Sequence, residues 1–322
     1  MGLGLARDVR DLQKMCGEQK RRQTPVVDRP LYYLHRRFVD EQDLLVIFFS
    51  KECRYRCNIC AVSSRGSRFE IDGDHLRCQF MQVMREMRNS LHVLESVTLS
   101  NEGSILDSET FDSTALDDVV QAVGSLRQVR RLSLETRIEF IDVDRLRELR
   151  ALSGEARLDM LTGLETLDDR IRNEIIGKLG SLDEFRAGLD RVADADCSLT
   201  SYVLFKPDPA MTDEEAYAEA ERSIRFLDNE CGRRQIPLTI RLNPMYAATG
   251  TQWAERAKAC VYTPPDLGDV LRLAKEERNR GVRIYIGLST EGLNESGMDY
   301  TGRKGYGPRL LISALQFNRG RV

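Results

Sequence analysis

The chain has 322 residues, of which 41% are hydrophobic and 31% charged, and its formal net charge is −3. This balance is ordinary for a folded protein, and the small net charge excludes a strongly basic field that would draw the whole surface onto nucleic acid. The sequence contains no apolar run long enough to span a membrane and no secretory h-region near its start, and its eight cysteines are not spaced as a secreted disulfide framework. We therefore expect a cytoplasmic protein with no membrane partner.

The first part of the chain is predicted to be a helix followed by an irregular lead-in. Apolar residues recur with a helical period over residues 3–22, and Pro25 and Pro30 interrupt the stretch from 24 to 43. We expect these residues to form an N-terminal extension, 1–43, to a catalytic core over 44–288. Residues 289–322 are predicted to be a C-terminal extension that covers the mouth of the core.

Strand-like and helix-like runs alternate throughout the core. Strands separated by helices of this length form βαβ units and a parallel sheet, and about seven strands is fewer than a closed eight-fold barrel needs. We predict an α/β fold, an open, partial (β/α) barrel of six to seven parallel strands. The predicted strands are 44–49, 96–99, 131–134, 158–162, 199–205, 238–242 and 282–287, and the predicted helices are near 75–90, 113–126, 142–150, 167–194 with a break at Gly180, 213–231 and 264–279.

Three cysteines follow the first predicted strand of the core. Cys53, Cys57 and Cys60 have the spacing C-x3-C-x2-C, directly after the apolar run 44–49. Three thiolates can hold three irons of a [4Fe–4S] cluster and leave the fourth iron open to another ligand. The spacing resembles the cluster loop of the radical S-adenosylmethionine superfamily. The resemblance implies a [4Fe–4S] cluster and S-adenosylmethionine as cofactors, with the latter bound to the open iron.

A zinc site is the alternative that the cysteines leave open. Cys57 and Cys60 are followed by His75-x2-Cys78, and these four residues could form a tetrahedral site in a non-catalytic interaction protein. This interpretation leaves Cys53 unused and places His75 in a predicted helix. The other cysteines are scattered and are expected to be buried thiols, with a second cluster left open: Cys16, Cys78, Cys197, Cys231 and Cys260.

Polar residues follow the predicted strands, where parallel α/β folds gather their chemistry. The second strand ends in Asn101-Glu102-Gly103-Ser104, which resembles the superfamily's glycine and glutamate motif for the S-adenosylmethionine amine, although it has one glycine instead of two. By the same resemblance, Glu135 and Glu165 would contact the ribose, and Arg137 would lie near the methionyl end. An aromatic residue often precedes the last cysteine in the superfamily, and here that residue is Ile59, which puts the adenine contact in doubt.

The later strand ends supply predicted substrate contacts, namely Lys206, Arg241 and Asn243. The order of Glu-Thr-Arg after the third strand, Gly-Leu-Glu-Thr-Leu-Asp-Asp after the fourth and Asn-Pro-Met after the sixth resembles the radical domain of the elongator catalytic subunit. It is still more similar to the radical partner of archaeosine synthase. The likeness extends over roughly residues 44–275.

The resemblance implies an enzyme that cleaves S-adenosylmethionine reductively to a 5′-deoxyadenosyl radical, which then abstracts hydrogen from the substrate. We expect a small-molecule substrate, such as a nucleoside or natural-product precursor, and a reductase, flavodoxin or ferredoxin as electron donor. Base modification in a transfer RNA, as in the archaeosine branch, is the second hypothesis. Binding to nucleic acid remains open, because the basic runs at 20–22, 36–37 and 233–234 are short.

Overall fold

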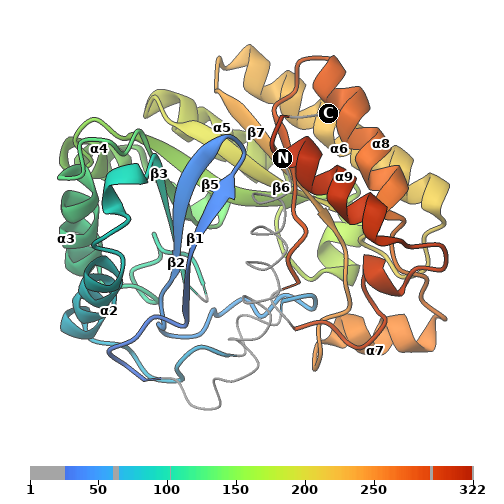
Figure 1. Cartoon of the computed structure of the whole chain (residues 1–322), viewed down its shortest axis with the longest axis horizontal. Coiled ribbons are helices and arrows are strands. Elements are labelled where there is room, and N and C mark those ends of the chain that lie inside the picture. Colours follow the sequence, from blue (N-terminus) through green and yellow to red (C-terminus); the bar gives the residue numbers. More distant parts are fainter. Residues whose placement is uncertain (1–25, 61–64, 102, 291–292, 321–322) are drawn as a thin grey trace.

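The computed structural model describes residues 26–60, 65–101, 103–290 and 293–320. Within these ranges, eight strands form one sheet in sequential order. Figure 1 shows the sheet curling between a flank that carries α2, α3 and α4 and a flank that carries α6, α8 and α9. The strands are β1 (Tyr32–Phe38), β2 (Glu41–Ile47), β3 (Ser96–Ser100), β4 (Arg131–Glu135), β5 (Arg157–Glu165), β6 (Ser198–Phe205), β7 (Leu238–Pro244) and β8 (Ile284–Ile286).

Helices connect the successive strands. The described helices that precede the last one begin at side-chain caps, and the helix predicted over 213–231 begins at a capping box formed by Thr212 and Glu215. The helices are α2 (Gly73–Glu86), α3 (Ser113–Gly124), α4 (Val143–Leu152), α5 (Leu182–Asp194), α6 (Asp213–Arg233), α7 (Gln252–Ala259), α8 (Leu267–Asn279) and α9 (Pro308–Asn318), with short turns at Leu91–Val93, Ile138–Phe140, Ile171–Ile175 and Tyr300–Gly302. No helix in the described ranges has the length and apolar character needed to cross a bilayer.

The predicted open barrel is confirmed, since β2 to β8 pair in parallel as seven consecutive strands. The irregular lead-in predicted over 24–43 is wrong for residues 32–38, which form β1 antiparallel to β2. The reversal is made by Val39 and Asp40, with Val39 at a positive φ of 53°. Residues 32–38 mix polar and aromatic residues, so their pairing is not evident from hydrophobic alternation. The helix predicted over 3–22 and Cys16 lie outside the described residues, and the domain boundaries remain predictions.

The helix predicted over 167–194 is divided into a π-helical turn at Ile171–Ile175 and α5. The non-helical segment spans residues 176–181 and includes Gly180, as predicted, and Gly177 within it has a φ of +73°. Helices α7 and α9 were not predicted. Helix α9 packs against α8 and β8.

The two faces of the sheet carry different residues because side chains alternate along each strand. Aliphatic side chains such as Leu44, Val97 and Leu132 point outward and are fully buried in the core beneath the helices. The inner face is polar at the amino ends of the strands, where buried Asp43 and Asp159 accept hydrogen bonds from serine and threonine hydroxyls. Beyond this polar layer, at the carboxyl ends, the inner face opens into a cavity.

Candidate active site at the carboxyl ends of the strands

The cavity has a volume of about 310 Å³ and lies inside the carboxyl ends of the strands. It brings together most of the residues that the sequence singles out. The predicted site residues that line it are Cys53, Cys57, Cys60, Asn101, Gly103, Glu135, Arg137, Glu165, Arg241 and Asn243. Glu102 lies outside the described residues.

The loop that carries the three cysteines is held by parts of the chain far away in sequence. The backbone N–H of Asn58 donates to the carbonyl of Ile176 at 2.7 Å, and its side-chain Nδ2 donates to the carbonyl of Ile175 at 3.1 Å. The carbonyl of Asn58 accepts from the N–H of Trp253 at 3.1 Å. The three cysteines of this loop are each half-buried. The loop therefore has a defined position on the cavity wall.

Two cationic side chains lie beside Cys57. The Nη1 of Arg137 is 3.8 Å from the Cys57 sulfur. The rest of the guanidinium is held by two other contacts. Its Nη2 donates to the carbonyl of Lys178 at 2.6 Å, and its carbon atom is 3.7 Å from the centre of the Tyr55 ring. The Nζ of Lys178 donates to Glu165 Oε1 at 2.8 Å. Burial raises the pKa of the Cys57 thiol, while the charges of Lys178 and Arg137 act in the opposite direction. These cations favour the thiolate, which is the form that binds metal.

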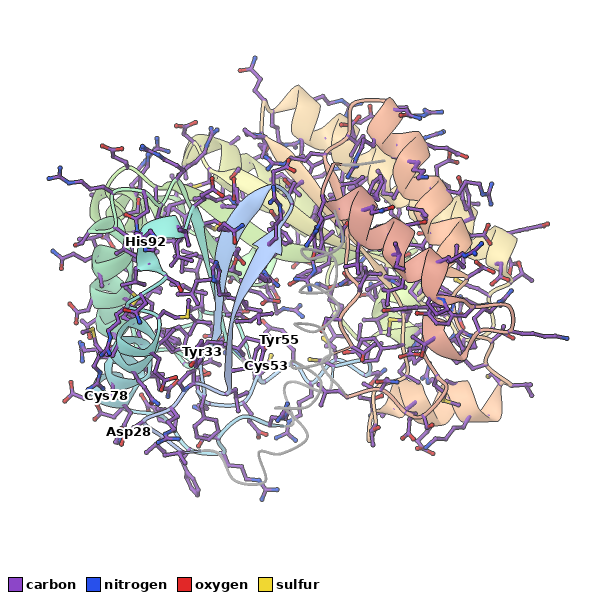
Figure 2. All side chains as sticks on the ribbon, viewed as in Figure 1. Asp28, Tyr33, Cys53, Tyr55, Cys78 and His92 are labelled. Atoms are coloured by element: carbon purple, nitrogen blue, oxygen red, sulfur yellow. The ribbon has the colours of Figure 1, made fainter. Side chains whose placement is uncertain are left out.

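The zinc alternative is not supported by this arrangement. In the part of the chain that the structure describes, no three His, Cys, Asp or Glu side chains converge closely enough to hold one metal ion. His75 Nδ1 lies 2.6 Å from Asp28 Oδ1, and Cys78 is exposed. Figure 2 shows Cys78 at the outer edge of the molecule while Cys53 lies toward its centre. An iron–sulfur cluster does not require the three thiolates to converge on one atom, because each thiolate binds a different iron. Three cysteines on one cavity wall beside two cations are compatible with such a cluster.

The end of β3 is fastened to the start of the cysteine loop. Asn101 donates from Nδ2 to Ser50 Oγ at 3.1 Å, and its Oδ1 accepts the N–H of Gly103 at 3.0 Å. Ser104 does not line the cavity, and its hydroxyl instead accepts the backbone N–H of Arg137 at 3.0 Å. Asn101 and Ser104 thus position the loops on either side of them.

A chain of hydrogen bonds crosses the cavity from β7 to β4. Arg241 Nη1 donates to the hydroxyl of Tyr202 at 3.2 Å, and that hydroxyl donates to Glu135 Oε1 at 3.1 Å. The sequence analysis did not single out Tyr202. Its place opposite Arg241 follows from the register of β6 with β7, which the sequence alone does not provide.

Gly163 makes room for an ion pair at the site. A β-carbon on Gly163 would lie 1.8 Å from Glu165 Oε1 and 2.8 Å from Lys178 Nζ, so a side chain at this position would displace the ends of both members of this ion pair. Glu165 has a positive φ of 68°, and the pairing of β5 with β6 shifts register between Gly163 and Glu165. The shift turns the Glu165 carboxylate into the cavity. The sequence analysis missed Gly163 and Lys178, although Gly163 stands within the motif that it quoted.

Lys206, a predicted substrate contact, lies outside the cavity wall. Its Nζ donates to Asp213 Oδ1 at 2.9 Å, and its side chain is 3% exposed. Asp213 also pairs with Arg303. Because Asp213 opens α6, Lys206 fastens the end of β6 to the start of the next helix.

Comparisons of sequence find distant relatives. No protein-family model matches the chain. An uncharacterised protein of Methanocaldococcus jannaschii is 21% identical over 266 residues, covering 81% of this chain and 71% of that protein. The archaeosine synthase subunit beta of Methanosarcina acetivorans is 22% identical over 242 residues, covering 74% of this chain and 68% of the subunit.

Comparisons of structure find the same fold. The Streptococcus suis protein SuiB bound to S-adenosylmethionine superposes with a TM-score of 0.54 at 15% identity, covering 80% of this chain and 53% of SuiB. The archaeal Elp3 of Methanocaldococcus infernus superposes with a TM-score of 0.50 at 11% identity, covering 78% of this chain and 60% of Elp3. The chain thus spans about half the length of the SuiB protein that it matches.

The fold is that of the radical S-adenosylmethionine enzymes, as the cysteine motif predicted. Within that class, the predicted resemblance to the elongator and archaeosine branch is confirmed by the matches to Elp3 and to archaeosine synthase subunit beta.

Proposed function

We propose that the protein is a radical S-adenosylmethionine enzyme that acts in the cavity at the carboxyl ends of its strands. The observation that carries the proposal is the lining of this one cavity by all three cysteines together with Glu135, Arg137 and Glu165. The fold shared with SuiB, whose structure is bound to S-adenosylmethionine, supports the same activity. The oxygen-sensitive cluster of such an enzyme is suited to the reducing cytoplasm.

In this proposal, Cys53, Cys57 and Cys60 hold a [4Fe–4S] cluster. The chemistry that such a cluster would supply when bound is the one-electron cleavage of S-adenosylmethionine to methionine and a 5′-deoxyadenosyl radical, which would remove hydrogen from the substrate. The electron comes from a reductase, a flavodoxin or a ferredoxin.

The protein's own residues hold the reactants and the thiolates in place. Glu135 and Glu165 offer carboxylate oxygens for ribose hydroxyls, and Lys178 holds the Glu165 carboxylate in place through a hydrogen bond of 2.8 Å. Arg137 lies near Cys57, where it stabilises negative charge on the cluster side of the cavity.

The test is reductive cleavage of S-adenosylmethionine by the purified protein. The full chain is reconstituted with iron and sulfide under anaerobic conditions, reduced with dithionite and incubated with S-adenosylmethionine. We expect 5′-deoxyadenosine and methionine by mass spectrometry, with more product when the right substrate is present. A reconstituted protein that binds iron and sulfide but makes neither product would refute the function.

Base modification in a transfer RNA is the second candidate, favoured by the similarity to archaeosine synthase subunit beta. The net charge of −3 gives the chain no general attraction to RNA, so this activity would require a partner subunit or a local basic surface. A gel-shift titration with bulk transfer RNA at low salt separates the two candidates. Failure to bind under those conditions removes transfer RNA as a substrate of the isolated chain.

A further inference from the structure

Glu135 and Glu165, which both line the cavity, each have one carboxylate oxygen bonded to a neighbouring side chain. Glu135 Oε1 accepts from the hydroxyl of Tyr202 at 3.1 Å, and Glu165 Oε1 accepts from Nζ of Lys178 at 2.8 Å. Among the described residues, no group donates to Oε2 of either glutamate. Each carboxylate therefore has one oxygen held by the protein and one oxygen available to a ligand.

The hydroxyl of Tyr202 directs its proton toward Glu135. It accepts a hydrogen bond from Arg241 Nη1 at 3.2 Å, and the guanidinium carbon of Arg241 is 5.0 Å from the centre of the ring. A phenol has a single proton, and burial raises the pKa of Tyr202, so the oxygen keeps this proton at neutral pH. Because Arg241 approaches the oxygen as a donor, the proton is left for Glu135, and the hydrogen bond holds the carboxylate in one orientation.

Lys178 reaches Glu165 from a non-helical segment whose backbone is held. The carbonyl of Lys178 accepts from Arg137 Nη2 at 2.6 Å, and its N–H donates to the carbonyl of Arg172 at 3.0 Å. Gly163 leaves the space in which the two side chains meet, because a β-carbon there would lie 1.8 Å from Glu165 Oε1 and 2.8 Å from Lys178 Nζ. The fold therefore sets the position of the ammonium group, and with it the position of Glu165 Oε1.

The two carboxylates come from neighbouring strands. Glu135 is the last residue of β4 and Glu165 is the last residue of β5, and these strands pair in parallel. Neighbouring strands lie about 4.8 Å apart, a separation that two adjacent hydroxyl groups can bridge when they donate in different directions. The two available oxygens thus suit a vicinal diol, such as the 2′- and 3′-hydroxyls of a ribose.

We propose that Tyr202 and Lys178 are positioning residues, each holding one oxygen of a glutamate so that the other oxygen accepts from one ribose hydroxyl. This inference rests on the proposed function, because it assigns the residues that orient the two ribose contacts. A carboxylate held at Oε1 presents Oε2 in one direction, whereas an unheld carboxylate must be ordered when the ligand binds. The arrangement uses both hydroxyls, so it selects a ribonucleoside over its 2′-deoxy and 3′-deoxy forms.

The experiment measures binding and does not require turnover. The full chain, reconstituted with iron and sulfide and kept free of reductant, is titrated anaerobically by calorimetry with S-adenosylmethionine and with its 2′-deoxy and 3′-deoxy forms. The wild type should bind each deoxy form about tenfold more weakly than S-adenosylmethionine, since a hydrogen bond to a charged group is lost.

Each variant should affect only the ligands that use its glutamate. Tyr202→Phe should weaken the binding of S-adenosylmethionine about fivefold and leave the dissociation constant of one deoxy form unchanged, because that form lacks the hydroxyl that Glu135 accepts. Lys178→Gln should do the same with the other deoxy form, through Glu165. A purely structural role would weaken the binding of all three ligands alike, so this pattern separates positioning from general damage.

Two matched controls carry the same changes outside the cavity. Tyr217→Phe removes a hydroxyl that donates to Glu276 at 2.6 Å, and Lys258→Gln removes an ammonium group that donates to Glu255 at 3.0 Å. Neither Tyr217 nor Lys258 is among the residues that line the cavity, so both variants should bind all three ligands as the wild type does.

Three outcomes overturn the assignment. A wild type that binds both deoxy forms as tightly as S-adenosylmethionine shows that the glutamates do not contact the ribose hydroxyls. Equal weakening of all three ligands in Tyr202→Phe, or no weakening of any, shows that Tyr202 does not position Glu135, and the same two results in Lys178→Gln exclude Lys178. A wild type that cleaves S-adenosylmethionine but does not discriminate against the deoxy forms refutes the positioning alone, whereas one that discriminates but makes no 5′-deoxyadenosine refutes the proposed function alone.

Discussion

The two halves of the inner face of the sheet are both polar, and they differ in whether their buried acceptor oxygens find hydrogen-bond donors. At the amino ends, both carboxylate oxygens of Asp43 accept hydrogen bonds, from Ser96, Thr98 and Arg36. At the carboxyl ends, Asn243 Oδ1 has no partner among the described residues. Because a satisfied network stabilises the fold and an unsatisfied one awaits a ligand, the first half serves stability and the second serves binding.

Because of this difference, we expect mutations in the two halves of the inner face to affect different properties. A change in the amino-end layer should lower the free energy of unfolding and leave the chemistry of the folded fraction intact. A change at the carboxyl ends should alter cofactor or substrate binding at little cost in stability. The four substitutions that follow test this separation, beginning with the largest effect.

Cys57→Ala should abolish the brown chromophore of the reconstituted protein and the formation of 5′-deoxyadenosine. The reason is that two thiolates cannot hold the cluster that three are proposed to bind. Iron and sulfide analysis and mass spectrometry check the result. Cys78→Ala and His75→Ala are the controls and should retain both properties, since Cys78 is exposed on α2 and His75 contacts Asp28. Cleavage of S-adenosylmethionine by Cys57→Ala would remove this residue from the site.

Asp159→Ala should lower the free energy of unfolding by about 3–5 kcal/mol, because it leaves buried hydrogen-bond donors without an acceptor. The Asp159 carboxylate accepts from Ser133, Ser198 and Thr200 at 2.8–2.9 Å. Urea unfolding measures the loss, and Thr200→Val, which removes one donor, should cost about 1 kcal/mol. A stable Asp159→Ala protein that has lost cofactor binding would contradict the division between the two halves.

Gly163→Ala should weaken the binding of S-adenosylmethionine about tenfold while changing the free energy of unfolding by only about 1 kcal/mol. The added methyl group would displace the ends of two side chains, Glu165 and Lys178, and would not clash with backbone. Gly180→Ala is the matched control in the same region, because a β-carbon there meets nothing within 4 Å. Equal dissociation constants for the two variants would show that the Glu165–Lys178 pair does not contribute to cofactor binding.

Tyr202→Phe should have the smallest effect, about 1 kcal/mol at neutral pH, through loss of the hydrogen bonds to Glu135 and Arg241. Burial raises the pKa of Tyr202 in the folded protein, so the folded state binds the phenolic proton more tightly than the unfolded state does. This stabilisation is complete below the ordinary tyrosine pKa of about 10 and is lost as the pH rises above it.

Urea unfolding at neutral pH and at a pH above about 10 checks this prediction for Tyr202. The stability advantage of the wild type over Tyr202→Phe should shrink at the higher pH. An advantage that stays constant or grows would contradict the assigned direction of the pKa shift.

Much of the fold could be predicted because its signals are local. The parallel strands are short apolar or alternating runs, such as the apolar run 44–49, each followed by a helical period, and the cysteine spacing is contained within eight residues of one loop. The edge strand β1 was missed because residues 32–38 become a strand through pairing with β2, which a local pattern does not reveal.

The parts of the site that sequence could not predict depend on contacts between distant segments. Lys178 reaches Glu165 because the chain reverses at Gly177, at a φ of +73°. Lys206 was predicted as a substrate contact from its place after β6, but in the structure its side chain pairs with Asp213 and does not line the cavity. A polar residue at the end of a strand is therefore a candidate site residue. Whether its side chain faces the cavity depends on the residues with which it forms hydrogen bonds and ion pairs.

The anchoring of the cysteine loop also constrains when the protein can mature. Asn58, between the second and third cysteines, is hydrogen-bonded to Ile175, Ile176 and Trp253. During translation these partners leave the ribosome long after the thiols do, because α7 lies more than half of the chain further on. The hydrogen bond from Trp253 to Asn58 can therefore form only after residue 253 has emerged, so loading of the proposed cluster into the finished loop would be a late step in biogenesis.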